Sequence, residues 1–394
     1  MKRTLLTGLA ILLGLAGLQG EARAQQMPLS PTATASVLTC GPGNDFYLTF
    51  GHSAIRICDT ARGIDMVYNY GTFDFGAPHF YWRFMRGQLD YRLGRNNFQT
   101  FMATYDYERR AVWEQPLNLT PQEVGNLFVM LEWNYLPENR YYRYDFFRDN
   151  CATRVRDMVE AACGKQTVEY GTCEKKSYRR WVHEASAGGC LQWWTLGVDL
   201  LLGLPADHVC SPSEAMFYPM TMMNLYATGT HGGHALVRGD RQLLADTRPP
   251  LHRSFPPLLV FSLLFAAVAV LTICADRLHL SQTFFHIVDR VLFILAGIVG
   301  LLLLFMWFGT DHYCTAWNLN ILWASPLLIL IAIRLGKSPR WALWLQEACF
   351  AAAAVWVVVC GLSVALIPLI LTLALRVAVL LLTPRKPQPR RQPR

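Results

Sequence analysis

The pattern of apolar and polar positions divides the 394-residue chain into two parts. Before Pro256, apolar and polar residues alternate over short stretches, whereas after it long apolar runs are separated by short polar or basic segments. Runs of this kind are typical of membrane-spanning helices. We therefore expect a folded domain over residues 25–250 and a membrane domain over 251–384, followed by a basic tail over 385–394.

The membrane part contains enough apolar sequence for five spanning helices. The expected spans are 257–275, 291–308, 319–333, 341–360 and 365–382. Most approach the roughly 20 residues that a helix needs to cross a bilayer. The last two form one nearly uncharged stretch, which we divide by a tight turn near Gly361 and Ser363. If they are instead one helix, the count is four.

The distribution of charge decides between these counts. A basic start, an apolar run from Leu5 to Leu18 and a small-residue segment ending at Ala24 predict a signal peptide over 1–24, with an N-terminal anchor as the alternative. Either interpretation exports the domain that follows. With five spans, the tail and the basic segment 334–340 both lie in the cytoplasm, as the positive-inside rule expects. We therefore predict five spans and a cytoplasmic C-terminus.

The formal net charge of +8 raises the question of a nucleic-acid partner. Between Gln25 and Phe255, however, 22 Lys and Arg residues face 23 Asp and Glu residues, a net charge of −1. The excess positive charge lies in the N-terminal segment, the loops between apolar runs and the tail, so it reflects membrane topology. We expect a membrane and no nucleic acid as partner.

Two stretches of the folded domain have the pattern of strands. Phe46–Cys58 alternates, is rich in β-forming residues and carries His52 in its middle. Asp65–Phe75 predicts its hairpin partner and carries Asn69. Together with the helices below, these strands predict an α+β fold with a small antiparallel sheet.

Two helices are also predicted. After Asp149 and Asn150, either of which is a natural N-cap, apolar residues recur at helical spacing until Gly164. Cys151 therefore sits in the first turn of a helix. A capping-box sequence at Thr120 begins another helix, which runs to about residue 136.

The position of Cys151 indicates chemistry. Unpaired backbone N–H groups and the helix dipole lower the pKa of a thiol at a helix start and make it a nucleophile. A histidine on a neighbouring strand can take its proton, and the same N–H groups can hold an oxyanion. We therefore predict Cys151 and His52 as catalytic, with Asn69 orienting the imidazole and Tyr68 or Tyr70 as the alternatives to Asn69. The further candidates for oxyanion-binding or orienting roles are Asn150, Ser53 and Tyr70.

The exported domain has seven cysteines, and an odd number in an oxidising compartment leaves one thiol unpaired if the others bridge. We expect Cys151 to be the free one, although Cys314 in the membrane part would change this parity. The disulfide candidates are Cys40, Cys58, Cys163, Cys173, Cys190 and Cys210. Six cysteines allow 15 connectivities, one of which joins Cys40 to Cys58, Cys163 to Cys173 and Cys190 to Cys210. No CxxC or HxxxH spacing occurs, so we expect no metal site.

The loop between the second and third predicted spans, 310–320, is polar and lies on the periplasmic side. Polar groups this close to the edge of a bilayer often line a site, although an ordinary capped loop would look the same. The candidate substrate-binding residues of the whole chain are Arg56, Arg154, His312, Thr315, Asn318 and Asn320.

The order of a histidine strand, a polar residue on the next strand and an Asn-Cys helix start resembles the circularly permuted papain-like fold of the NlpC/P60 superfamily. Enzymes of the lecithin:retinol acyltransferase type belong to that group. More closely, several segments resemble the Bacteroidetes-type lipoprotein N-acyltransferase family: Leu38–Gly43, Phe50–Ile57, Val67–Phe75, Asn150–Asp157 and the motif His312, Thr315, Asn318, Asn320, Trp323, Pro326.

The resemblance implies an enzyme of the bacterial inner membrane with its catalytic domain in the periplasm. Cys151 would accept an acyl chain from a membrane phospholipid with His52 as base. The acceptor would be the α-amine of an S-diacylglyceryl cysteine on an apolipoprotein, and no cofactor would be needed. One alternative is a cell-wall cysteine peptidase or amidase on the same fold. Another is a non-enzymatic membrane scaffold in which Cys151 is structural.

Overall fold

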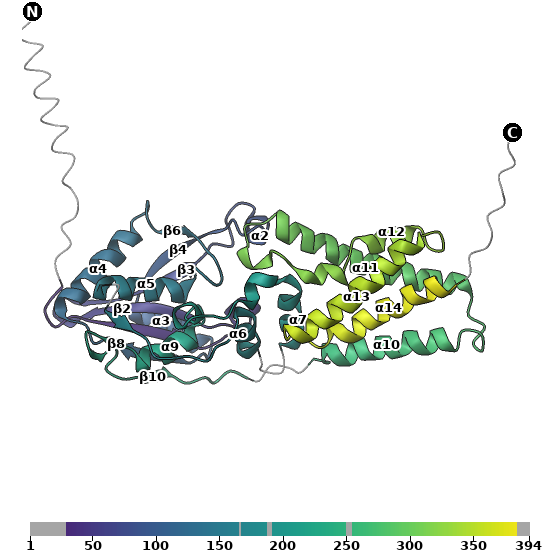
Figure 1. Ribbon diagram of the computed structural model, residues 1–394. Coiled ribbons are helices and arrows are strands. Elements are labelled where there is room, and N and C mark those ends of the chain that lie inside the picture. The colour runs from purple at the N-terminus through teal and green to yellow at the C-terminus, as the bar shows by residue number, and fades with distance from the viewer. Residues whose placement is uncertain (1–28, 165–166, 187–190, 250–253, 384–394) are drawn as a thin grey trace, which may run out of the picture.

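A computed structural model of the protein describes residues 29–164, 167–186, 191–249 and 254–383. The predicted signal peptide, the basic tail and Cys190 lie outside these ranges. An N-terminal domain of strands and helices lies end to end with a helical bundle (Figure 1). The chain passes from the first part to the second near residue 256, where the apolar pattern changes.

Seven strands of the described chain form one antiparallel sheet in the order β10-β5-β1-β2-β3-β4-β6. They are β1 Thr34–Cys40, β2 His52–Asp59, β3 Ile64–Thr72, β4 Asp90–Asn97, β5 Val112–Pro116, β6 Tyr141–Arg143 and β10 Arg241–Leu244. A second, three-stranded sheet is formed by β7 Val168–Glu169, β8 Thr230–His231 and β9 His234–Ala235. The α+β class is confirmed, and the main sheet is larger than predicted.

Strand β2 begins at His52, whereas the alternation predicted a start at Phe46. The preceding residues form a 3-10 turn, η1 Phe46–Leu48, which returns through Gly51 at a φ of +77°. A Cβ atom at Gly51 would lie 2.4 Å from the carbonyl oxygen of Cys40, so the turn requires glycine. His52 therefore lies at the end of the sheet and not in the middle of a strand.

Helices cover both faces of the main sheet. The helices of the N-terminal domain are α2 Phe80–Met85, α3 Phe98–Tyr107, α4 Pro121–Tyr135, α5 Cys151–Cys163, α6 Tyr178–Ala185, α7 Gln192–Leu201, α8 Pro212–Ala215 and α9 Pro219–Thr228. The capping box predicted at Thr120 is present and starts α4. α4 and α5 pack on one face of the sheet, and α3 packs on the other.

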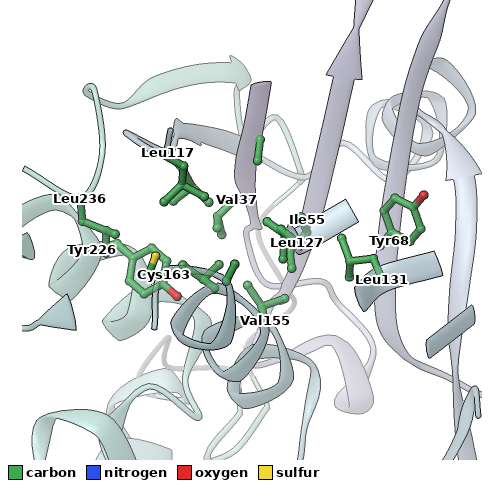
Figure 2. Packing of buried hydrophobic residues seen from close by; sticks show 14 of the residues in the cluster. Val37, Ile55, Tyr68, Leu117, Leu127, Leu131, Val155, Cys163, Tyr226 and Leu236 are labelled. Carbon is green, nitrogen blue, oxygen red and sulfur yellow. The ribbon is translucent and has the colours of Figure 1, made fainter. Parts of the chain in front are cut away.

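The core between the sheet and α4 and α5 fixes the position of Cys151. Ile55 of β2 meets Leu127 of α4 and Val155 of α5, all fully buried (Figure 2). Burying each such side chain stabilises the fold by roughly 1.5–3 kcal/mol. Because this packing holds α5 along its length, the start of the helix is held at the end of the sheet where β2 begins.

The C-terminal region is a bundle of helices: α10 Pro257–Ile273, α11 Gln282–Phe308, α12 Leu327–Ile333, α13 Arg340–Val359 and α14 Leu366–Leu382. Among the described residues, three segments are long and apolar enough to cross a membrane, namely Gln282–Phe308, Tyr313–Ile333 and Arg340–Val359. α10 and α14 are apolar but shorter, at 17 residues each.

Two of the predicted spans differ from the observed helices. α11 starts at Gln282 and not at residue 291, and so includes Asp289, whose carboxylate is buried 2.6 Å from the guanidinium of Arg376. This pairing permits a charge that the apolar pattern excluded. The span predicted over 319–333 is broken into η5 Leu319–Leu322 and the seven-residue α12. The predicted turn near Gly361 is present, with a φ of +64°.

Helix α7 joins the two parts of the molecule. The side-chain amide of Asn318 donates to the carbonyl of Leu200, and that of Asn320 donates to the carbonyl of Asp199. The buried carboxylate of Asp199 accepts from Arg179 and from the backbone N–H of Ser363, which follows α13. These contacts fix the N-terminal domain on the end of the bundle.

All ten cysteines within the described residues are free. The predicted Cys40–Cys58 disulfide is wrong, because Cys40 pairs with His52 and Cys58 with Thr34, at opposite ends of the β1–β2 ladder. The disulfide candidates Cys163, Cys173 and Cys210 are also unbridged. Cys151 is free as expected, but the argument from parity does not single it out.

Candidate functional site

Cys151 is the first residue of α5, and Asn150 caps that helix. The Asn150 side-chain oxygen accepts from the N–H groups of Ala152 and Thr153, and its amide donates to the carbonyls of Phe146 and Phe217. Asn150 therefore uses its side chain to fix the start of the helix. Because its side chain is fully used in this way, Asn150 is not available for the oxyanion-binding role for which it was a candidate.

His52 forms a hydrogen bond with the residue predicted to orient it. Its Nε2 lies 2.7 Å from the side-chain oxygen of Asn69 on β3. Because that oxygen can only accept, Nε2 carries the hydrogen and the lone pair of the neutral ring lies on Nδ1. The ring is thus held in the tautomer that can take a proton at Nδ1.

The sulfur of Cys151 lies against the start of β2. The backbone N–H of Ser53, the residue after His52, hydrogen-bonds this sulfur. The ladder between β2 and β3 begins only at Ile55, so this N–H is not used by the β3 strand. Ser53 thus contributes its backbone, whereas its hydroxyl is buried without a hydrogen-bond partner in the described structure.

Gly71 on β3 leaves room for Cys151. A Cβ atom at Gly71 would lie 3.4 Å from the Cβ of Cys151 and 3.6 Å from the ring of Tyr144. Its φ of +85° is also one that residues with side chains rarely adopt. The absence of a side chain at this point lets the helix start approach the end of the sheet.

Burial dominates the protonation of the pair. It raises the pKa of the Cys151 thiol to about 11, although backbone N–H groups at the sulfur lower it. It lowers the pKa of His52 to about 4, although the hydrogen bond to Asn69 raises it, and nearby Arg110 lowers it further. The predicted depressed thiol pKa is therefore wrong, because desolvation of the anion outweighs the helix start. At neutral pH the resting pair is a thiol and a neutral imidazole.

Cys151, His52 and Asn69 all line one cavity of about 390 Å³. This volume is in the range of ligand pockets, and most of the wall is apolar or aromatic, including Phe50 and Phe73. No group of three His, Cys, Asp or Glu side chains within the described residues is placed to hold a metal ion.

The sequence interpretation missed most of the cavity wall, including Arg110, Glu108 and Tyr144. Arg110 is buried and donates to the carbonyl of Gly41 and to the carboxylate of Glu108, so it brings an ion pair beside His52. Tyr144 stacks on Tyr91 with ring centroids 4.2 Å apart. The run of aromatic residues between positions 141 and 147, just before Cys151, was a sequence signal that could have identified Tyr144. No local pattern marked Arg110 or Glu108.

The bundle supplies His312 to the same cavity. The Nε2 of His312 lies 3.1 Å from the carbonyl oxygen of Met85, at the end of α2, so the ring bridges the two parts of the molecule. Of the four predicted residues in this loop, His312 alone lines the cavity. Thr315 hydrogen-bonds carbonyls of its own segment, and Asn318 and Asn320 hold α7.

The remaining candidates lie away from the cavity. Arg56 forms ion pairs with Asp65 and Glu114. Arg154 pairs with Asp149, and Tyr70 is buried in the core between the sheet and α5. Each of these side chains stabilises the domain, so none is placed to touch a substrate in the cavity.

Two family models match the chain and together cover most of it. One, described as the Lnb N-terminal periplasmic domain, matches residues 22–183, and the other, described as the Lnb transmembrane domain, matches residues 250–387. No curated protein and no solved structure matches the chain. The matches identify the N-terminal domain as periplasmic and the bundle as a transmembrane domain of the inner membrane.

Proposed function

The chain belongs to the Lnb family, and on that premise we propose that it is a lipoprotein N-acyltransferase. The enzyme moves an acyl chain from a membrane phospholipid, through a thioester on Cys151, to the α-amine of a diacylglyceryl-cysteine lipoprotein. The single observation that carries this proposal is a buried thiol and an oriented imidazole in one apolar cavity at the junction with the transmembrane domain.

The first step forms the thioester. The sulfur of Cys151 attacks the ester carbonyl of the phospholipid while Nδ1 of His52 takes the thiol proton. The backbone N–H groups of Cys151 and Ser53 hydrogen-bond the sulfur, and in this proposal they hold the oxyanion. The intermediate then expels the lysophospholipid alkoxide, which takes the proton back from His52. Because the resting pair is neutral, proton transfer accompanies attack.

The second step forms the amide. A free α-amine ordinarily has a pKa near 8, so it is partly neutral at physiological pH and is a competent nucleophile. It attacks the thioester carbonyl, His52 takes a proton from the attacking nitrogen, and the departing Cys151 thiolate is protonated from His52. The products are an N-acylated lipoprotein and the free thiol.

Both substrates carry acyl chains, which explains why a thiol domain is joined to a membrane bundle. We propose that all five helices of the bundle span the membrane, with α10 and α14 as the two shorter ones. An odd number of spans puts the C-terminal tail in the cytoplasm, consistent with its basic residues. We also propose that the domain is a permuted papain-like fold, supported by its order of His strand, Asn strand and Cys helix.

The test is acylation of the purified full-length protein in vesicles. A phospholipid with a labelled acyl chain should leave a hydroxylamine-sensitive label on Cys151, and a diacylated lipoprotein peptide added next should gain one amide-linked chain by mass spectrometry. Cys151→Ala should lose both signals, by at least about 10⁴-fold.

Cys163→Ala is the matched control, because Cys163 is a buried thiol at the other end of the same helix. It should acylate as the wild type does. An active Cys151→Ala variant refutes the mechanism. Cleavage of a muropeptide without any acylation would instead favour the cell-wall peptidase.

A further inference from the structure

Residues 73–89, which connect β3 to β4 and carry α2, form an aromatic arm at the junction of the two parts of the molecule (Figure 1). One side of α2 exposes large aromatic side chains: Tyr81 is 79% exposed and Trp82 is 51% exposed. Exposed aromatic groups gathered on one short helix are unusual on a surface that meets only water. This surface therefore points to a contact with something other than water.

The other side of the aromatic arm faces the catalytic cavity. Phe80 is buried against Phe73 and Tyr91, which fixes the arm to the domain. Phe84 and Leu89 line the cavity that contains Cys151. The arm is thus a wall with the cavity on one side and exposed aromatic rings on the other.

The aromatic arm is attached to the end of a spanning helix. The ring of Trp82 lies 5.8 Å from that of Phe305 in the last turn of α11. Arg86 donates to the carbonyl of Gly309, and the N–H of Asp311 donates to the carbonyl of Arg86. Because α11 is 27 residues long and apolar, its end lies at the surface of the bilayer, and α2 lies at the same level.

The residue types of α2 suit that level. Trp and Tyr are enriched where membrane and water meet, and arginine can reach from there to lipid phosphates. α2 carries Tyr81, Trp82 and Arg83 in succession and is followed by Arg86. Because Trp82 packs against Phe305, the apolar surface of the arm adjoins the apolar surface of α11.

We propose that the aromatic arm is the portal through which phospholipids of the periplasmic leaflet reach Cys151. Its outer face, with Tyr81 and Trp82, inserts into the interfacial layer, and its inner face, with Phe84 and Leu89, guides one acyl chain into the cavity. This inference rests on the proposed acyl transfer for its purpose, but the contact between the arm and lipid is measurable without any catalysis.

The first experiment measures that contact. A benzophenone amino acid replaces Trp82 in the full-length Cys151→Ala protein, which is placed in phosphatidylethanolamine–phosphatidylglycerol vesicles and irradiated. Trp133 of α4 is the matched control, since it is 58% exposed and α4 lies in the part of the domain far from the bundle (Figure 1). We expect phospholipid to be captured at position 82, and at position 81 as a second probe site, but not at position 133. Equal capture at 82 and 133 overturns the proposal.

The second experiment compares two donors in the otherwise native protein. Trp82→Ser should slow formation of the Cys151 thioester from long-chain vesicle lipid about tenfold more than from a dihexanoyl phospholipid dispersed as monomers, because the monomer enters from water. Trp133→Ser should leave both rates unchanged. Equal slowing with both donors overturns the portal. If the wild type forms no thioester from either donor, the proposed function fails, while the cross-linking result still decides the position of the arm.

Discussion

Two histidines in this protein make nearly the same hydrogen bond in different surroundings. The Nε2 of His52 lies 2.7 Å from the amide oxygen of Asn69, and the Nε2 of His183 lies 2.8 Å from the carboxylate of Asp199. His52 shares a cavity with a free thiol, whereas His183 belongs to a packed cluster that joins the periplasmic domain to the bundle.

The two sites differ in how many of the hydrogen-bonding and charged groups around each histidine are paired. Asp199 accepts from His183, from Arg179 and from the backbone N–H of Ser363, so its charge is balanced and its oxygens are used. At the other site, Asn69 is uncharged and leaves Nδ1 of His52 with a lone pair beside a cavity. The first arrangement stabilises an interface, and the second leaves a ring nitrogen that can accept a proton, as the proposed function requires.

The most direct test of this comparison is to remove each imidazole in turn. His52→Ala should slow thioester formation by about 10³-fold or more, since a general base contributes on the order of 10²–10⁴. His183→Ala should change the rate per folded molecule by less than about threefold, because its partners are structural. Both rates are measured as labelled phospholipid on Cys151 in vesicles. Similar losses in the two variants would contradict the division of roles.

The hydrogen bond that orients His52 should have an intermediate effect. Asn69→Ala should slow thioester formation about tenfold, the equivalent of roughly 1.4 kcal/mol, because the ring keeps its place but loses its fixed tautomer. Asn69→Asp sharpens the result by giving His52 a carboxylate partner like that of His183. That variant should raise the pKa of His52, which a shifted pH profile would reveal. Wild-type rates and profile in both variants would exclude Asn69 as the orienting residue.

The dependence on pH should be weak. Burial lowers the pKa of His52 to about 4, so the base stays neutral and active until the pH falls towards that value. Burial also raises the pKa of Cys151 to about 11, so no rise from thiolate appears below about pH 9. Thioester formation should vary by less than about twofold between roughly pH 5.5 and 8. It is measured without acceptor, whose amine titrates separately. A midpoint near 6.5 would contradict the neutral, buried pair.

The smallest effect on chemistry, with a large one on stability, is expected at Asp199. Asp199→Asn removes one of the two carboxylates that pair with buried Arg179, while Asp207 keeps the other, and should lower the free energy of unfolding by about 1.5–3 kcal/mol. Thioester formation per folded molecule should be unchanged. Thermal unfolding of the full-length protein in detergent gives the first quantity, and Asp106→Asn on an exposed position of α3 is the control. An inactive but equally stable Asp199→Asn would place this cluster in the chemistry.

Much of the candidate site could be predicted because its signals are local. The Asn150 cap, the start of α5 at Cys151 and the end of the helix at Gly164 follow from residues that are neighbours in the chain. Asn69 could be placed beside His52 because the two lie on adjacent strands of a hairpin. The same reasoning failed for Cys40 and Cys58, where flanking a strand suggested a bridge but pairing put the two thiols at opposite ends of the ladder.

The sequence by itself determined the division into a periplasmic and a membrane part, the strands and the helix that carry the candidate pair, and the identity of that pair, since helix caps, strand alternation and apolar runs act over a few residues. The tertiary structure decided what the pair is like chemically and what surrounds it. The pKa values of Cys151 and His52 depend on burial, and Arg110, Tyr144 and His312 reach the cavity from distant segments. Desolvation and cavity shape sum contributions from the whole fold, so no local pattern contains them.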